Sequence, residues 1–332
     1  MLIKDIIEKY SGLLSATSPT ARLDVEIILC HILGWDRVKL MINYGQDLDS
    51  DKMSIFEDMI AKRLDQMPIA YIINKKEFMG LDFYVDERVL IPRPDTELLV
   101  EDLVESIGEM ESTKQARDIN VLDMCTGSGA IILSGASLWK DRAKEDSGKA
   151  KDGTVNFIGV DISKSALEVA TINRKSFGLD TVKLIESDLF TNLGDYRGCL
   201  DIIVSNPPYM HSNGLINEND KKAISRHGLK CDIEDVIRVA SDLVKPNGKF
   251  FMVNRPNRLV DMLAIARSYK LEAKQIRFVH SRVASAPKMV LIEYVKCAKP
   301  EIRVLSPLYV YNEDGTYTDE VKAIYSNQSV DI

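Results

Sequence analysis

The pattern of apolar and polar positions predicts helices in the first part of the chain. Apolar residues recur at intervals of three and four from Ile3 to Tyr10, and again in R-L-D-V-E-I-I-L-C-H-I-L-G. This spacing places apolar side chains on one face of a helix. Ser18 marks the expected start of the second helix and Gly34 its end, and a third helix is expected over about 50–66. Residues 1–75 are therefore predicted to form a small helical bundle domain.

A different pattern begins after this bundle. Alternation, aromatic residues and a glycine in E-F-M-G-L-D-F-Y-V predict a β-hairpin linker over 76–90, and helical spacing returns over 95–107. Beyond it, β-rich runs alternate with helical runs, which is typical of a parallel, doubly wound α/β sheet with helices on both faces. The charged stretch 140–153 is expected to be a loop. The predicted strands are 119–124, 155–161, 182–188, 200–205 and 249–254, and the predicted helices are 129–140, 164–177, 232–244 and 257–269.

Composition narrows the class of protein. The chain is 45% hydrophobic, and no apolar run is long enough to span a membrane. The amino terminus carries acids within its apolar pattern, unlike a signal peptide, so we expect a cytoplasmic protein with no membrane partner. The five cysteines include no C-x-x-C pair and the four histidines are dispersed, so neither a bound metal nor a disulfide framework is expected.

The formal charge of −7 hides a polarity along the chain. Residues 221–299 hold 17 Lys and Arg against 7 Asp and Glu, a local charge of +10. One interpretation is a solvated basic face balanced by acidic neighbours, and the other is a surface that faces a polyanion such as tRNA. Arg226, His227, Arg255, Arg258, Arg277 and Arg282 are the candidates for phosphate contacts.

The first candidate site follows a predicted strand in V-L-D-M-C-T-G-S-G-A-I. Gly127 and Gly129 lack a Cβ, so the backbone can approach a ligand closely where the next helix begins. Asp161 ends the following strand, where a carboxylate can bind both hydroxyls of a ribose, although it can also cap a helix. Asp188 ends the third strand and is a candidate for the exocyclic amine of an adenine. The turn lacks the dinucleotide and triphosphate patterns, which favours a single nucleoside such as S-adenosylmethionine.

The second candidate site is S-N-P-P-Y, at the end of the strand 200–205. Proline cannot donate to a sheet, so Asn206, Pro207 and Pro208 are expected to form a rigid turn. The Asn206 side-chain oxygen and the Pro207 carbonyl would accept the two hydrogens of a planar NH2 group, and Tyr209 would stack on its conjugated plane. A purely structural turn with a buried aromatic residue is the alternative.

This geometry suits methylation of an unreactive nitrogen. The lone pair of an amide or aromatic amine is delocalised, and hydrogen bonds to both hydrogens return electron density to the nitrogen as it attacks a methyl group. No general base is needed because the proton can leave after the transfer. The four residues Asn206, Pro207, Pro208 and Tyr209 are therefore the predicted catalytic set.

With these motifs, the chain resembles the class I S-adenosylmethionine-dependent methyltransferases that carry N-P-P-Y. Up to Tyr209 it is similar to the release factor glutamine N5-methyltransferases, through the helical segment quoted above, V-L-I-P-R-P-D-T-E-L-L-V-E, L-D-M-C-T-G-S-G-A-I and S-N-P-P-Y. The resemblance implies a Rossmann-like fold and a helical domain that helps to dock a release factor and present the Gln of its Gly-Gly-Gln loop. Asn74 stands where that family usually has Gly, a change that left-handed backbone tolerates.

Beyond Tyr209 the sequence resembles another family. Segments such as G-K-F-F-M-V-N-R-P-N-R-L-V-D-M-L and P-L-Y-V-Y-N-E-D-G-T-Y-T-D-E in 210–332 are similar to bacterial methyltransferases that modify N6 of an adenine in valine tRNA. Three functions follow: glutamine methylation of a release factor, which the longer resemblance favours, adenine methylation of tRNA, and a non-catalytic binding protein on a methyltransferase scaffold.

The resemblance also assigns the site residues. We expect Pro92 and Arg93 to bind substrate together with the Asn206–Tyr209 motif. The residues expected to bind S-adenosylmethionine are Cys125, Thr126, Gly127, Ser128, Gly129, Asp161, Asp188, Leu189 and Asn206.

Overall fold

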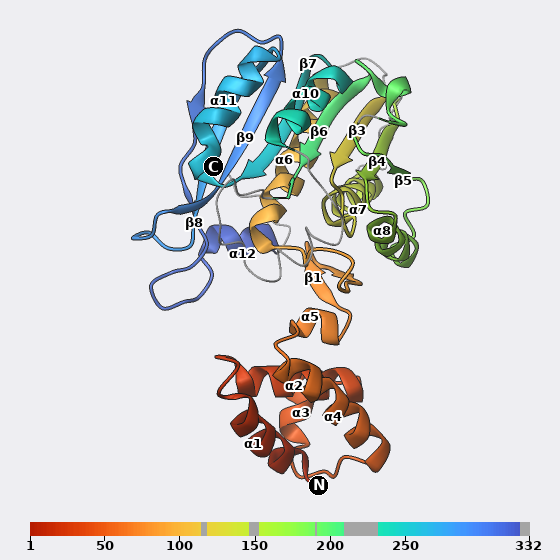
Figure 1. Cartoon of the computed structure of the whole chain (residues 1–332), viewed down its shortest axis with the longest axis vertical. Coiled ribbons are helices and arrows are strands. Elements are labelled where there is room, and N and C mark those ends of the chain that lie inside the picture. Colours follow the sequence, from red (N-terminus) through yellow and green to blue (C-terminus); the bar gives the residue numbers. More distant parts are fainter. Residues whose placement is uncertain (114–117, 146–152, 190, 209–231, 326–332) are drawn as a thin grey trace. The chain divides into compact units, whose positions relative to one another are not determined.

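The computed structural model describes residues 1–113, 118–145, 153–189, 191–208 and 232–325. The chain divides into two compact units (Figure 1). The first comprises Met1–Lys76 with Val85–Glu87, and the second comprises Glu77–Tyr84 with Arg88–Ile332. Each unit has its own buried core.

The first unit is helical, as its sequence predicts. Its long helices pack around a core that includes Phe56, whose ring meets that of Tyr10 edge to face with centroids 5.0 Å apart. Gly34 ends the second helix in the left-handed conformation that favours glycine, with a φ of 64°. Its helices are α1 (Ile3–Leu14), α2 (Ala21–Leu33), α3 (Arg37–Ile42), α4 (Ser50–Leu64) and α5 (Ile69–Ile72).

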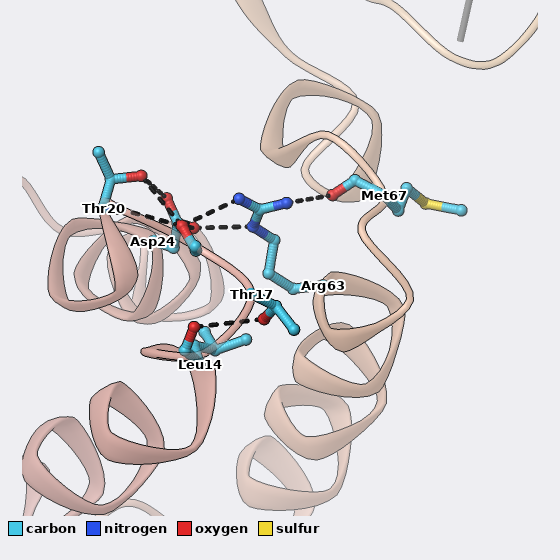
Figure 2. Close-up of polar contacts among 7 residues, drawn as sticks. Leu14, Thr17, Thr20, Asp24, Arg63 and Met67 are labelled. Atoms are coloured by element: carbon cyan, nitrogen blue, oxygen red, sulfur yellow. Dashed lines mark hydrogen bonds and ion pairs between the residues drawn. The ribbon is translucent and has the colours of Figure 1, made fainter. Parts of the chain in front are cut away.

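Ser18 does not start the second helix as expected. Helix α2 begins at Ala21, and the Ser18 hydroxyl instead donates to the Oδ2 atom of buried Asp24, 2.7 Å away. Figure 2 shows the ion pair at the centre of this cluster, in which Arg63 Nε donates to the same oxygen at 2.7 Å. Thr20 donates to the other Asp24 oxygen at 2.9 Å, so the buried carboxylate is fully engaged. This network joins α2 to α4.

The second unit is built on a nine-stranded sheet. The strands are ordered β10-β8-β9-β7-β6-β3-β4-β5, and β11 also pairs with β8. From β5 to β7 the neighbouring strands are parallel, and the order reverses at β3, which is the topological switch point of a doubly wound sheet. The strands are β3 (Ile119–Met124), β4 (Val155–Asp161), β5 (Lys183–Glu186), β6 (Leu200–Ser205), β7 (Val244–Asn254), β8 (Leu271–His280), β9 (Pro287–Lys296), β10 (Arg303–Val304) and β11 (Leu308–Tyr309).

Helices cover both faces of this sheet (Figure 1). Helices α6, α7 and α8 pack in succession on one face, α10 and α11 pack together on the other, and α12 packs against α6. Their bounds are α6 (Glu97–Thr113), α7 (Ala130–Glu145), α8 (Lys164–Ser176), α10 (Ile233–Leu243), α11 (Leu259–Ser268) and α12 (Asp319–Tyr325), with short 3₁₀ turns at Pro94–Thr96, Gly194–Tyr196 and Pro256–Arg258.

The structure corrects the predicted sheet in two ways. It is mixed rather than wholly parallel, because β9 runs antiparallel to both β7 and β8. The long strands β8 and β9, which the sequence did not reveal, extend it beyond β7. Helix α7 also continues to Glu145, into the stretch expected to be a loop, and residues 146–152 lie outside the described part.

Strands β1 (Lys76–Phe78) and β2 (Leu81–Phe83) pair to form a two-stranded hairpin. Asn173, fully buried on α8, holds its end in place. The Asn173 Oδ1 atom accepts from the backbone N–H of Tyr84 at 2.7 Å, and its Nδ2 atom donates to the carbonyls of Tyr84 and Ser128 at 3.1 and 2.9 Å. One buried amide therefore ties the hairpin to the Gly-rich turn.

Candidate active site

The predicted site residues meet at a cavity of about 200 Å³ in the second unit. It lies at the carboxyl ends of β3, β4, β5 and β6, where ligands bind in doubly wound sheets. The predicted residues that line it are Pro92, Arg93, Cys125, Thr126, Gly127, Ser128, Asp161, Asp188, Leu189, Asn206, Pro207 and Pro208. Gly129 is not among the lining residues, and Tyr209 lies outside the described residues.

Asp161 fixes the Gly-rich turn to the end of β4. Its Oδ2 atom accepts from the backbone N–H of Gly127 at 2.9 Å, and its Oδ1 atom accepts from that of Ser163 at 2.9 Å. Ser163, rather than Asp161, is the N-cap of α8 and accepts from Ala166 N at 3.1 Å. Two backbone amides therefore hold the Asp161 carboxylate at the edge of the cavity. Its oxygens have further lone pairs, which are suited to accept hydrogen bonds from the hydroxyls of a ribose.

The two glycines of the turn serve different purposes. Both have positive φ, +55° at Gly127 and +82° at Gly129. A Cβ at Gly127 would meet nothing within 4 Å, so this glycine leaves the backbone open to the cavity. A Cβ at Gly129 would lie 2.7 Å from Leu133 Cδ1. The positive φ of Gly129 and its close approach to Leu133 therefore both disfavour a side chain at this position, where α7 begins.

Asp123 lies beneath the same turn with a fully buried side chain. Its Oδ2 atom accepts a hydrogen bond from Thr126 Oγ1 at 2.6 Å. Burial raises the pKa of this carboxyl group to about 7, the Thr126 hydrogen bond opposes the rise, and the negative charge of Asp161 adds to it. The Gly-rich turn is therefore bonded to Asp123, an acid that changes charge near neutral pH.

Asp188 follows β5 and has an exposed side chain at the cavity. Its Oδ1 atom accepts from the backbone N–H and the hydroxyl of Thr191, at 2.8 and 2.9 Å. Ser187 Oγ accepts from the N–H of Leu189 at 3.1 Å, and Leu189 is left-handed with a φ of 75°. These bonds hold Asp188 and the buried side chain of Leu189 at the cavity. The acid suits the edge of an adenine, and the apolar side chain suits its face.

Asn206 follows β6 and is held by a residue from another element. Its Nδ2 atom donates to the hydroxyl of Thr96 at 3.2 Å, and Thr96 also lines the cavity. Thr96 is buried at the 3₁₀ turn before α6. Thr96 was not predicted as a site residue, although it lies in the segment I-P-R-P-D-T-E.

Apolar side chains from the segment after the hairpin complete the wall. Only Pro92 and Arg93 were predicted here from the sequence, whereas the preceding residues line the cavity as well. The additional lining residues are Phe78, Arg88, Val89, Leu90, Ile91, Ala130, Ile131, Ile162, Ser163, Ala166 and Ser187. The cavity therefore offers polar groups at the strand ends and an apolar surface opposite, which fits S-adenosylmethionine.

Many basic residues in the segment 221–299 have acidic partners. Arg258 Nε lies 2.9 Å from Asp261, and Arg277 pairs with Glu320. Arg226 and His227 lie outside the described residues. Further pairs are Arg238–Asp235, Lys245–Asp201, Lys249–Glu109 and Arg267–Glu272. Asp201, Glu109 and Glu320 lie outside the segment, so their pairs with Lys245, Lys249 and Arg277 favour the interpretation of a basic segment balanced by acidic neighbours.

Two family models match the chain. One, described as the PrmC N-terminal domain, matches residues 5–73, and the other, described as a methyltransferase domain, matches residues 115–304. The release factor glutamine methyltransferase of Clostridium acetobutylicum is 40% identical over 217 residues, which are 65% of this chain and 70% of that protein.

Two further relatives carry the same description. The protein of Leptospira interrogans is 40% identical over 252 residues, covering 72% of this chain and 80% of its own. That of Shewanella oneidensis is 30% identical over 279 residues, covering 82% and 87%. Residues 1–209 are fewer than two thirds of the 332 residues, so a match to 82% of the chain extends past Tyr209 into the segment that resembles tRNA methyltransferases.

The fold, the cavity at the strand ends and the match over residues 115–304 define an S-adenosylmethionine-dependent methyltransferase. Within this class, the chain belongs to the release factor glutamine methyltransferase family. The fold class, the enzyme class and the cofactor predicted from the sequence are thereby confirmed.

No helix among the described residues is long and apolar enough to cross a membrane. Among the same residues, no group of three or more His, Cys, Asp and Glu side chains is arranged to hold a metal ion.

Proposed function

We propose that this protein methylates the side-chain nitrogen N5 of the glutamine in the Gly-Gly-Gln loop of peptide chain release factors. The supporting observation is the convergence on one cavity of the Gly-rich turn, Asp161 and Asn206–Pro208. The relatives described as release factor glutamine methyltransferases support the choice of substrate. Release factors act in the cytoplasm, and we propose the same location for this protein.

S-adenosylmethionine, when bound, supplies a methyl group on a positively charged sulfur. Asp161 would accept hydrogen bonds from the ribose hydroxyls. The backbone at Gly127 would leave room beside the turn for the rest of S-adenosylmethionine. Asp188 and Leu189 would contact the adenine edge and face. The other members of this proposed binding set are Cys125, Thr126, Ser128, Gly129 and Asn206.

The catalytic contribution of the chain is to orient the substrate nitrogen. The Asn206 side-chain oxygen and the Pro207 carbonyl would accept the two hydrogens of the glutamine amide, and the proline pair keeps both acceptors on a rigid backbone. These bonds raise the electron density on nitrogen, and one proton leaves it for water after the methyl group is transferred. Pro92 and Arg93 would contact the peptide around the glutamine, and Tyr209 would cover the amide plane.

Purified protein, a release factor and methyl-labelled S-adenosylmethionine test this proposal. We expect label in the release factor with the unchanged enzyme and none with Asn206→Ala. Asn120→Ala is the matched control, because Asn120 lies in β3 away from the cavity lining and donates to the Cys199 carbonyl. It should retain full activity. Equal labelling by Asn206→Ala and the unchanged enzyme would refute the assigned role of Asn206.

Adenine N6 methylation of tRNA is the second candidate, because an adenine amine presents the same two hydrogens as an amide. The charge of +10 in residues 221–299 favours it. The ion pairs that three of its basic residues form with Asp201, Glu109 and Glu320, which lie outside the segment, oppose it. Valine tRNA is therefore included in the same assay, and label in tRNA without label in release factor would replace the first proposal. Absence of heat on addition of methyl donor in calorimetry would support a non-catalytic protein instead.

A further inference from the structure

Thr96 lies where it can control the orientation of the Asn206 side chain. It belongs to the 3₁₀ turn Pro94–Thr96, its side chain is buried, and its backbone N–H donates to the Arg93 carbonyl at 3.0 Å. The two residues are 110 positions apart, yet Thr96 Oγ1 lies 3.2 Å from Asn206 Nδ2 and both line the same cavity. The contact thus links the start of α6 to the end of β6.

The side chain of asparagine is planar and has two unlike ends. One end is a carbonyl oxygen that accepts hydrogen bonds, and the other is an NH2 group that donates them. The proposed reaction needs the oxygen to face the hydrogens of the substrate nitrogen. If the amide rotated away from this position, its oxygen would no longer face these hydrogens, and both the hydrogen bond and its electronic effect would be lost.

We infer that Thr96 is a positioning residue that holds the Asn206 amide in the plane from which its oxygen reaches the substrate nitrogen. Its hydroxyl accepts from Nδ2 and so restrains rotation of the amide about its last side-chain bond, with the oxygen at the opposite end of the group. This role rests on the proposed function of Asn206. It assigns to the I-P-R-P-D-T-E segment a part in catalysis that is separate from the substrate contacts proposed for Pro92 and Arg93.

Loss of this hydrogen bond should act on the rate rather than on binding. A neutral hydrogen bond contributes modestly to such a preference, so removing it should lower kcat by roughly five- to tenfold. The cofactor contacts of Gly127 and Asp161 remain, so the Kd for S-adenosylmethionine should stay within about twofold. The KM for release factor should change equally little, because the contacts along the peptide are retained.

The test uses Thr96→Val, which keeps the shape and loses the hydroxyl, and Thr96→Ser, which restores it. Steady-state methylation of release factor gives kcat and KM, calorimetry gives the Kd of the methyl donor, and thermal unfolding checks folding. We expect Thr96→Val to lower kcat five- to tenfold and Thr96→Ser to stay within about twofold of the unchanged enzyme. Thr113→Val, which removes a hydroxyl bonded to the Glu109 carbonyl at the other end of α6, is the control and should leave kcat unchanged.

Different failures have different meanings. An unchanged kcat in Thr96→Val, or a loss in Thr96→Ser equal to that in Thr96→Val, would overturn the inference while the proposed function stands. A rise in the Kd of methyl donor that accounts for the whole loss would also overturn it, since Thr96 would then act on the cofactor. Should Thr96→Val fail to fold, Thr96→Ala is used in its place with the same expectations.

The unchanged enzyme reports separately on the proposed function. If it methylates tRNA and not release factor, the proposed substrate is wrong, and the same Thr96 comparison is made with tRNA, whose adenine amine needs the same acceptor. If it methylates neither, both the proposed function and the role of Thr96 are overturned.

Discussion

Asp123 provides a quantitative test of the structure beneath the cofactor cavity. Its buried carboxyl group has a pKa of about 7, compared with an ordinary value of 3.8. The folded protein therefore keeps this proton to higher pH than the unfolded chain does, and folding is favoured by protonation. It follows that stability is lost as the pH rises from about 4 to about 7, the reverse of the usual behaviour of a salt-bridged acid.

The perturbation is Asp123→Asn, which removes the titration and keeps an oxygen that can accept from Thr126. One pKa unit corresponds to about 1.4 kcal/mol. Between pH 5 and pH 8, the free energy of unfolding of the unchanged protein should therefore fall by about 2–3 kcal/mol relative to that of the variant. Other titrating groups contribute to both proteins and largely cancel in this difference.

Urea denaturation of both proteins at pH 5 and pH 8 measures this change. Asp195→Asn, which alters an exposed acid, is the control and should give the same difference from the unchanged protein at both pH values. If the difference between Asp123→Asn and the unchanged protein were the same at pH 5 and pH 8, or moved in the opposite direction, the reasoning about the buried carboxyl group would be refuted.

Three other substitutions test further parts of the structure. Arg63→Ala leaves the buried Asp24 carboxylate without its cation and should cost the helical unit about 3–5 kcal/mol in urea denaturation; a loss below 1 kcal/mol would show that the pair is unimportant. Gly129→Ala adds a Cβ at positive φ against Leu133 and should cost about 1–3 kcal/mol, so an unchanged Tm would contradict the assigned packing. Asp161→Ala removes the acceptor for Gly127 N and the proposed ribose ligand, so calorimetry should show at least about tenfold weaker binding of S-adenosylmethionine, whereas unaltered binding would exclude that role.

Local signals in the sequence predicted the features that depend on neighbouring residues. Gly34 was predicted to end a helix because glycine adopts the left-handed conformation without strain, and the structure has it there. Asn74 was expected to tolerate the same conformation, and its φ is 51°. The strand ends that carry Asp161 and Asn206 were also predictable, because apolar runs followed by polar residues mark them directly.

Features that depend on distant residues were not predictable in this way. Ser18 resembles a helix cap, but its hydroxyl binds Asp24 beside Arg63, 45 residues further along the chain. Strand β8 carries Glu272 and Arg277 within its apolar pattern, and their charges are compensated by partners outside the strand. A single sequence does not display such partners, so β8 was missed.

In the site, too, features set by neighbouring residues were predictable, and features set by distant residues were not. The Gly-rich turn and the Asn-Pro-Pro run each signal their chemistry through consecutive residues. Thr96 gave no such signal, because its partner Asn206 lies 110 residues away and meets it only in the folded chain. The close approach of Leu133 to Gly129 was not predicted either, because the sequence does not show which side chain packs against a glycine.

Peptide mapping by mass spectrometry shows directly whether the cavity methylates the glutamine of a release factor. Release factor is incubated with S-adenosylmethionine and either the unchanged enzyme or Asn206→Ala, and the peptide with the Gly-Gly-Gln sequence is fragmented. We expect one added methyl group on the glutamine side chain with the unchanged enzyme and none with the variant. An unmodified glutamine, with methyl groups found instead on adenine of valine tRNA treated in parallel, would contradict it.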